Sequence, residues 1–214
     1  MKKFVPIIIL MVVVIAMSVM GECFSRPTIT VVKLEVTNSW GDSWQGTGFF
    51  VADDVIVTAG HMVADANSVT VVYSNGDKRT GYDWYQENPS ITDVGIVRVK
   101  TPERERTVLL VDCEIGDRVK AIGDPYGHFP VTTFGHISGL NINDIYFGMK
   151  NLILVDVALN PGNSGCPIIG RHGVVAICVG GIQSANNMCF CVRAEIVQLV
   201  LDKYWAIERL KEAE

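Results

Sequence analysis

Short runs of apolar and β-branched residues recur along most of the chain, and turn-forming residues separate them. Runs of this length, with no helical period between them, predict β-strands. A dozen short strands without intervening helices predict barrels or sandwiches rather than a parallel sheet. The expected strands are Val31–Val36, Gly48–Val51, Val55–Thr58, Val69–Tyr73, Val94–Val99, Arg118–Ile122, Val131–Ser138, Ile145–Phe147, Leu152–Ala158, Ile168–Ile169, Val174–Val179 and Met188–Val192.

Two segments between these runs organise the chain. Asn75-Gly76-Asp77, between two of the expected strands, is a turn sequence typical of a β-hairpin. The segment from Thr101 to Cys113 contains Pro102 and four alternating charges, and we expect it to be the crossing between two lobes.

The end of the chain has a different period. From Ala194 the apolar residues step by three or four positions, with charged residues on the other faces. This period predicts an amphipathic C-terminal helix over about 194–212. We expect its apolar face to pack against the second lobe, and a contact with another copy of the chain is the alternative. The apolar positions are Ile196, Val200, Tyr204, Ile207 and Leu210.

The first residues have the pattern of a targeting segment. Lys2 and Lys3 supply positive charge, and the run from Val5 to Met20 is apolar apart from Ser18. Residues 1–23 are therefore expected to be either a cleaved signal peptide or a membrane anchor that spans residues 5–21. In both cases residues 24–214 are expected outside the cytoplasm, periplasmic, secreted or held at the membrane.

The composition is that of a folded domain. Hydrophobic residues make up 49% of the 214 residues and charged residues 19%, which excludes a disordered chain. The formal net charge is −5. No basic cluster lies after the leader, so nucleic-acid binding has no electrostatic support.

Six cysteines in an exported protein can form disulfides. Cys189 and Cys191 share one face of an expected strand, and Cys178 on a neighbouring strand can face one of them. A bridge between these strands is one interpretation, and buried free thiols that act as small hydrophobic side chains are the other. The chain has no Cys-x-x-Cys motif and no Cys/His spacing that indicates zinc, so neither a metal nor another cofactor is expected.

A serine stands between two glycines in Asn160-Pro161-Gly162-Asn163-Ser164-Gly165. Asn, Pro and Gly are common turn residues, so this segment alone fits a plain turn as well as a nucleophile site. Two other positions favour the nucleophile. His61 follows the expected strand that ends at Thr58, and Asp93 precedes the one that begins at Val94.

Serine, histidine and aspartate supply a nucleophile, its base and the residue that orients the base. A serine hydroxyl is a weak nucleophile and needs a neighbouring base. Histidine titrates near neutral pH and takes and returns the proton, while a buried carboxylate holds the ring tautomer. The order His61, Asp93, Ser164 is one of the known chain orders of such a triad. Since the first two precede the crossing and the serine follows it, we expect the site at the cleft between the lobes.

Several motifs occur together in one order along the chain. Gln45-Gly46-Thr47-Gly48-Phe49 resembles a Gly-Ser/Thr-Gly-Phe strand, and Ala121 to Gly127 resembles a Gly-Asn-Pro-Phe-Gly loop. Thr58 to His61, Thr92 to Ile96 and Asp156 to Gly165 resemble a histidine, an aspartate and a serine motif. Together they resemble the trypsin-like serine proteases of the chymotrypsin fold, and in particular the protease domain of the HtrA (high-temperature-requirement) family.

The resemblance implies an all-β fold of two six-stranded antiparallel β-barrels. The N-terminal barrel would cover about 28–100 and the C-terminal barrel about 114–193, followed by the terminal α-helix, with an apolar leader helix at the N-terminus. It also implies a serine endopeptidase that hydrolyses peptide bonds of protein or peptide substrates through an acyl-enzyme, without a cofactor.

The resemblance also implies residue roles. Ser164 would be the nucleophile, His61 the general base and acid, and Asp93 its orienter. The oxyanion hole would be formed by the backbone N–H groups of Gly162 and Ser164. Asn163 stands where zymogen-activated relatives carry an aspartate, so activation by a newly cleaved N-terminus is not expected.

Specificity is indicated by Ala158, six residues before the serine, where relatives that cleave after basic residues carry an acidic side chain. Val179 to Gly181, with Gly180 at its centre, would form one wall of the substrate pocket. We therefore expect a preference for small or medium apolar residues before the scissile bond. Two departures from the family are Cys166, where a glycine is usual, and the lack of room for a PDZ domain after the helix.

Two other functions fit the sequence. A protease-like fold without catalysis would serve as a binding module, and a small membrane-anchored interaction protein would use the leader as its functional part. Neither explains why all three triad residue types are present. The oligomeric state is not indicated by the sequence.

Overall fold

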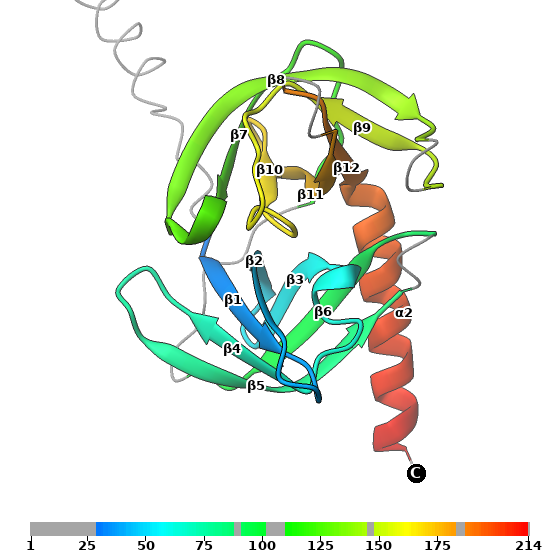
Figure 1. The fold of residues 1–214 in the computed structure, drawn as a ribbon. Coiled ribbons are helices and arrows are strands. Elements are labelled where there is room, and N and C mark those ends of the chain that lie inside the picture. The colour runs from blue at the N-terminus through cyan, green and yellow to red at the C-terminus, as the bar shows by residue number, and fades with distance from the viewer. Residues whose placement is uncertain (1–28, 88–90, 102–109, 145–147, 183–186, 214) are drawn as a thin grey trace, which may run out of the picture.

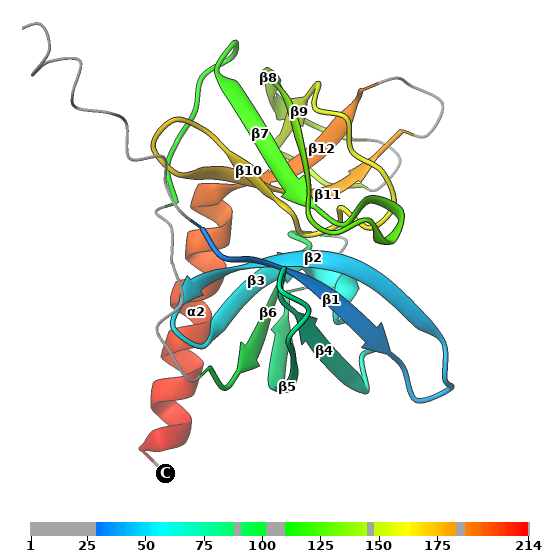
Figure 2. The ribbon, with the colours of Figure 1, turned by 90° about the vertical axis from the view of Figure 1, so that its left-hand side faces the viewer.

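The structure, a computed structural model, describes residues 29–87, 91–101, 110–144, 148–182 and 187–213. These residues form two closed six-stranded antiparallel β-barrels and one long C-terminal helix, α2, which runs beside both barrels (Figures 1 and 2). The expected all-β class of two six-stranded barrels is confirmed. The expected leader over residues 1–23 and the expected strand Ile145–Phe147 lie outside the described residues.

The first barrel closes in the strand order β1-β2-β3-β6-β5-β4. Val and Ile supply most of its inward-facing side chains, as expected for residues that pack on a pleated surface. Its strands are β1 (Val31–Thr37), β2 (Ser43–Ala52), β3 (Val55–Ala59), β4 (Ser68–Val72), β5 (Lys78–Gln86) and β6 (Val94–Val99).

The second barrel closes in the order β10-β11-β12-β9-β8-β7. A distinct buried cluster lies in it, in which five cysteines pack beside Val, Ile and Ala side chains. Its strands are β7 (Arg118–Gly123), β8 (Val131–Ile142), β9 (Leu152–Val155), β10 (Pro167–Ile169), β11 (Val174–Gly181) and β12 (Cys189–Arg193).

The main difference from the sequence-based strands is β5. It begins directly after the predicted hairpin turn, where Gly76 has a φ of +90°, and pairs with β4. Its first residues, Lys78 to Thr80, are exposed and polar, so no apolar run marks the strand. The hairpin itself is confirmed.

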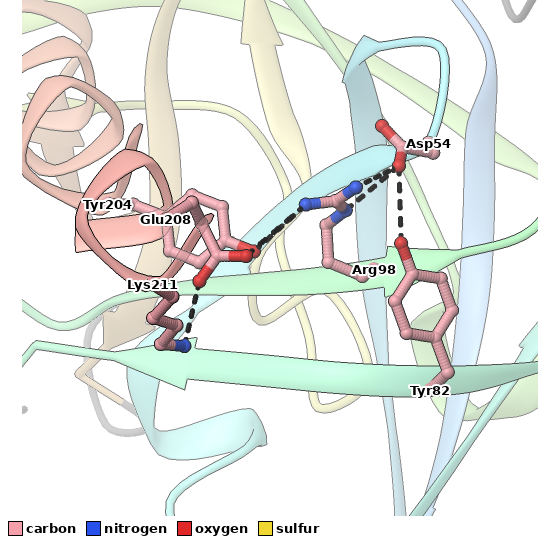
Figure 3. Close-up of polar contacts among 6 residues, drawn as sticks. All are labelled: Asp54, Tyr82, Arg98, Tyr204, Glu208 and Lys211. Carbon is pink, nitrogen blue, oxygen red and sulfur yellow. Dashed lines mark hydrogen bonds and ion pairs between the residues drawn. The ribbon is translucent and has the colours of Figure 1, made fainter. Parts of the chain in front are cut away.

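Helix α2 (Ala194–Glu212) has the predicted period but contacts more than the second barrel. It packs on β11 and β12 and also on β6 of the first barrel. Arg98 of β6 donates to the Tyr204 hydroxyl at 3.3 Å and to Asp54, and its guanidinium lies 3.7 Å from Glu208 (Figure 3). The predicted packing on the second lobe is confirmed, and the polar cluster around Arg98 also ties the helix to the first.

The cysteines of the described residues are free and buried. Cys178 lies opposite Cys191 in the β11–β12 register, so the expected proximity is present without a bridge. Burial raises the pKa of the Cys189 thiol to about 11. The interpretation of these residues as small hydrophobic side chains therefore holds in this structure.

Among the described residues, no helix is both long and apolar enough to cross a membrane. The same residues contain no group of three or more His, Cys, Asp or Glu side chains arranged to hold a metal ion.

Candidate active site

Barrel pairing brings His61 and Asp93 to the same end of the first barrel. His61 lies in the short 3-10 turn Gly60–Met62, directly after β3, and Asp93 lies directly before β6. Because β3 and β6 are antiparallel neighbours, with Ala59 opposite Val94, the end of one meets the start of the other. Asp93 has a φ of 47°, an unusual value for a non-glycine residue, which places its carboxylate under the histidine turn.

Asp93 holds His61 by two hydrogen bonds. Its Oδ1 accepts the His61 backbone N–H at 2.7 Å, and its Oδ2 lies 2.8 Å from His61 Nδ1. The aspartate side chain is 4% exposed and the histidine side chain 40% exposed, so the carboxylate is shielded while the ring faces outward. Burial opposes protonation of the ring, but the hydrogen bond and the charge of Asp93 outweigh it and raise the pKa of His61 above 6.5.

Ser164 lies in the turn between β9 and β10 and is half-buried. This turn packs on the first barrel, because the Thr47 N–H of β2 donates to the Ser164 carbonyl at 2.9 Å. A Cβ on Gly165 would lie 2.7 Å from the Ala59 nitrogen, at the end of the strand that leads to His61. Among the described residues, the Ser164 hydroxyl makes no hydrogen bond to the His61 ring. Such bonds are often long without substrate.

The carbonyl groups of the serine turn are all hydrogen-bonded. Asn163 N–H donates to the Asn160 carbonyl at 3.0 Å, Tyr126 N–H to Pro161 at 2.8 Å and Cys166 N–H to Asn163 at 2.9 Å. The Thr47 hydroxyl donates to the Gly162 carbonyl at 2.8 Å. Since the Thr47 amide donates to the Ser164 carbonyl, every carbonyl from residue 160 to 164 accepts a hydrogen bond from the protein.

The N–H groups of the same turn divide into two sets. Those of Asn163, Gly165 and Cys166 donate within the protein. Within the fully described stretch 161–166, the N–H groups of Gly162 and Ser164 donate no hydrogen bond. Two unpaired donors on residues two positions apart, in a turn whose carbonyls are held, have the arrangement that can bind an anionic oxygen.

Gly162 is required by its surroundings. It has a φ of +101°, and a Cβ at this position would lie 2.0 Å from the Asp124 carbonyl oxygen. The turn thus depends on residues 124–127 of the second barrel, which lie against it. Residues 45–49 and 121–127 were noticed in the sequence as motifs, but only the structure gives Thr47 and Tyr126 a contact with the serine turn.

Ala158 follows β9 and Gly180 belongs to β11, and β12 lies between these two strands in the second barrel. Ala158 is exposed, and the preceding Val157 carbonyl is 3.4 Å from the Cys189 thiol, which donates to it. Cys189 of β12 pairs with Gly181 of β11, so this one residue contacts both the segment before the serine turn and the end of β11. Cys189 therefore lies between the two sequence-predicted pocket residues, and sequence reasoning did not select it. A substrate pocket at Ala158 and Gly180 stays a prediction.

Known proteins share this chain's family and fold. The trypsin-like peptidase domain family matches residues 46–177. A probable periplasmic serine endoprotease DegP-like of Chlamydia trachomatis is 34% identical over 177 residues, covering 76% of this chain and 34% of that protein. Serine protease HTRA1A of Danio rerio is 29% identical over 174 residues, covering 77% of this chain and 36% of that protein. The chain thus spans about one third of the length of these curated relatives.

Two solved structures have the same fold. The HtrA-type protease AlgW with a tripeptide aligns with a TM-score of 0.75 and 23% identity over 83% of this chain and 60% of that chain. The serine endoprotease from Yersinia pestis aligns with a TM-score of 0.70 and 22% identity over 84% of this chain and 63% of that chain.

Proposed function

The chain belongs to the trypsin-like peptidase domain family, and from this premise we propose that it is a serine endopeptidase with Ser164 as nucleophile, His61 as base and Asp93 as orienter. The observation that carries the proposal is the His61–Asp93 pair at one barrel edge, facing a serine turn whose two free N–H groups are Gly162 and Ser164. The activity stated in the names of the curated relatives, serine protease, agrees with it.

In the proposed reaction, His61 takes the proton of the Ser164 hydroxyl as the oxygen attacks the scissile carbonyl. The tetrahedral oxyanion accepts hydrogen bonds from the Gly162 and Ser164 N–H groups, each typically worth about 10²–10³-fold in rate. His61 then returns the proton to the leaving amine, and water resolves the acyl-enzyme by the same path in reverse. Asp93 stabilises the imidazolium throughout, which agrees with the raised pKa of His61.

For the substrate, we propose protein or peptide chains with a small or medium apolar residue before the scissile bond. Ala158 provides no charge for a basic side chain, and the Val157 carbonyl before it accepts a hydrogen bond from the thiol of Cys189, whose strand pairs with Gly180 and Gly181. A series of peptide substrates that differ only at this residue tests the preference. We expect the apolar members to have kcat/KM at least about 10-fold above lysine or arginine members.

A fluorophosphonate probe tests the activity itself. We expect the purified protein to be labelled on Ser164 and to cleave casein, and Ser164→Ala to remove both, with a loss of about 10⁶-fold in kcat. A folded protein that is not labelled, or a Ser164→Ala variant that is labelled equally, would favour the alternative of a non-catalytic protease-like binding module.

We also propose that the domain acts outside the cytoplasm. The basic and apolar pattern of residues 1–23 supports export, and the curated relative of Chlamydia trachomatis is named periplasmic. Mass spectrometry of the N-terminus from the native host decides between a cleaved signal peptide, which removes these residues, and an anchor, which keeps them.

A further inference from the structure

Thr47 has a position in the structure that the expected triad does not explain. It lies in β2 of the first barrel, is fully buried, and contacts the serine turn 115 residues later. Its amide donates to the Ser164 carbonyl at 2.9 Å, and its hydroxyl donates to the Gly162 carbonyl at 2.8 Å. The hydroxyl also accepts the Asp124 N–H at 3.1 Å, so its donor and acceptor capacity are both used.

The two carbonyl groups that Thr47 binds, those of Gly162 and Ser164, lie on either side of the Asn163–Ser164 peptide group, which carries one of the two free donors. A peptide group is planar, so holding the Gly162 carbonyl fixes the plane of the Gly162–Asn163 peptide, which links the two peptide groups that carry the free donors. The Gly162–Asn163 peptide lies between the two free N–H groups and is joined to the first of them by a glycine. Glycine restricts its own dihedral angles little, so without an external contact this peptide is free to rotate.

Other hydrogen bonds in the turn come from backbone amides, and a side-chain change cannot remove them. The Pro161 carbonyl is held by the Tyr126 amide, and the Asn163 carbonyl by the Cys166 amide. The hydroxyl of Thr47 is the contact with the 160–164 carbonyls that a substitution can delete while β2 keeps its register.

We propose that Thr47 is a positioning residue for the reaction, whose hydroxyl holds the Gly162–Asn163 peptide so that the Gly162 and Ser164 N–H groups both point at the oxyanion. This role rests on the proposed function of the site. This role accounts for a threonine between Gly46 and Gly48. A valine would have nearly the same shape at this position, but it has no hydroxyl to donate.

The test compares Thr47→Val with Thr47→Ser in the full chain. Active sites are first counted by fluorophosphonate titration to its endpoint, so that kcat refers to folded and competent molecules. We expect Thr47→Val to lower kcat per site by about 10- to 100-fold while KM changes by less than about 3-fold. Thr47→Ser, which keeps the hydroxyl, should return kcat to within about 3-fold of wild type. A peptide aldehyde, whose adduct places an oxygen at the free donors, should bind Thr47→Val more weakly by the same factor as kcat/KM falls.

Thr58→Val is the matched control, because Thr58 is an equally buried threonine whose hydroxyl donates to the Thr47 carbonyl at 2.7 Å and to none of the turn carbonyls. The role of Thr47 is overturned if Thr47→Val has the kcat of wild type, if Thr47→Ser is as impaired as Thr47→Val, or if Thr58→Val lowers kcat equally. A wild type that is not labelled overturns the proposed function and this role with it. A labelled wild type beside an unimpaired Thr47→Val overturns only the role of Thr47.

Discussion

The ammonium group of Lys33 lies 3.6 Å from the carboxylate of Asp124, which is fully buried at the junction of the two barrels. Neither oxygen of that carboxylate has a hydrogen-bond partner, so the long ion pair is its main compensation for burial. Burial raises the pKa of Asp124, and the charge of Lys33 offsets only part of the effect. The charged form is therefore disfavoured in the folded protein.

We expect Asp124→Asn to stabilise the protein at neutral pH by about 1 kcal/mol, or about 2–4 °C in Tm. A carboxyl whose pKa is raised on folding lowers stability once the pH exceeds its unfolded value, about 3.9. The gain should therefore vanish below about pH 4 and grow as the pH rises through the folded pKa. Thermal unfolding from pH 3 to 8 measures this gain in stability.

Lys33→Met, which leaves the buried charge of Asp124 unpaired, should destabilise the protein, while the exposed Asp65→Asn should change its stability little. A Tm that falls equally at all pH values in Asp124→Asn would contradict the explanation.

The raised pKa of His61 predicts the pH dependence of hydrolysis. The ring acts as a base only when neutral, so kcat/KM should fall as the pH falls through a value above 6.5. Asp93→Asn removes the carboxylate charge and its hydrogen bond, the two largest effects that raise the pKa of His61, and leaves burial, which lowers it. In Asp93→Asn we expect the His61 resonance to titrate below its wild-type value by NMR, and kcat to fall by about 10⁴-fold. An unchanged titration would show that Asp93 does not control the ring.

Arg98 predicts how the C-terminal helix is held. Its guanidinium joins Asp54 of the β2–β3 turn to Tyr204 and Glu208 of α2, and it is 18% exposed (Figure 3). Arg98→Leu leaves Asp54 without its cation, and we expect a loss of about 1–3 kcal/mol in chemical denaturation. Arg98→Lys should recover only part of it, because an ammonium cannot make the same fork of contacts. The exposed Arg209→Leu is the control. Equal effects of the two leucine variants would remove any special role of the cluster.

The sequence predicts local motifs well, but it does not predict the long-range contacts between them. Apolar runs located eleven strands and the helix, and the turn at Gly76 was readable from its residues. The polar start of β5 carries no apolar run, so its pairing with β4 and β6 decides that it is a strand. His61 and Asp93 were predicted at strand ends, but their hydrogen bonds depend on β3 pairing with β6.

The contacts of Thr47 and Arg98 were beyond sequence reasoning for the same physical reason. Thr47 reaches Gly162 across 115 positions and Arg98 reaches Tyr204 across 106. Neither residue type nor local spacing encodes such a partner, because barrel closure and the docking of α2 create the proximity. The structure explains part of the departure at Cys166. Its side chain is fully buried, so the thiol fills space in the core of the second barrel, and its amide holds the Asn163 carbonyl.

At Gly162, the cost of the positive φ can be separated from the cost of the steric clash with Asp124. Gly162 has a φ of +101°, and Gly162→Ala places a methyl group 2.0 Å from the Asp124 carbonyl oxygen. Gly116 offers the control, because it has a similar φ of +91° but a new Cβ there would have nothing within 4 Å. Both alanine variants bear backbone strain of about 1–3 kcal/mol, but only Gly162→Ala must also displace the neighbouring backbone. We expect Gly162→Ala to be the less stable of the two in urea and to lose about 10²–10³-fold in kcat per titrated site, because its N–H is moved from the oxyanion position. Gly116→Ala should keep the wild-type kcat. If both variants lose the same stability and Gly162→Ala keeps its activity, the Gly162 N–H is not a donor to the transition state.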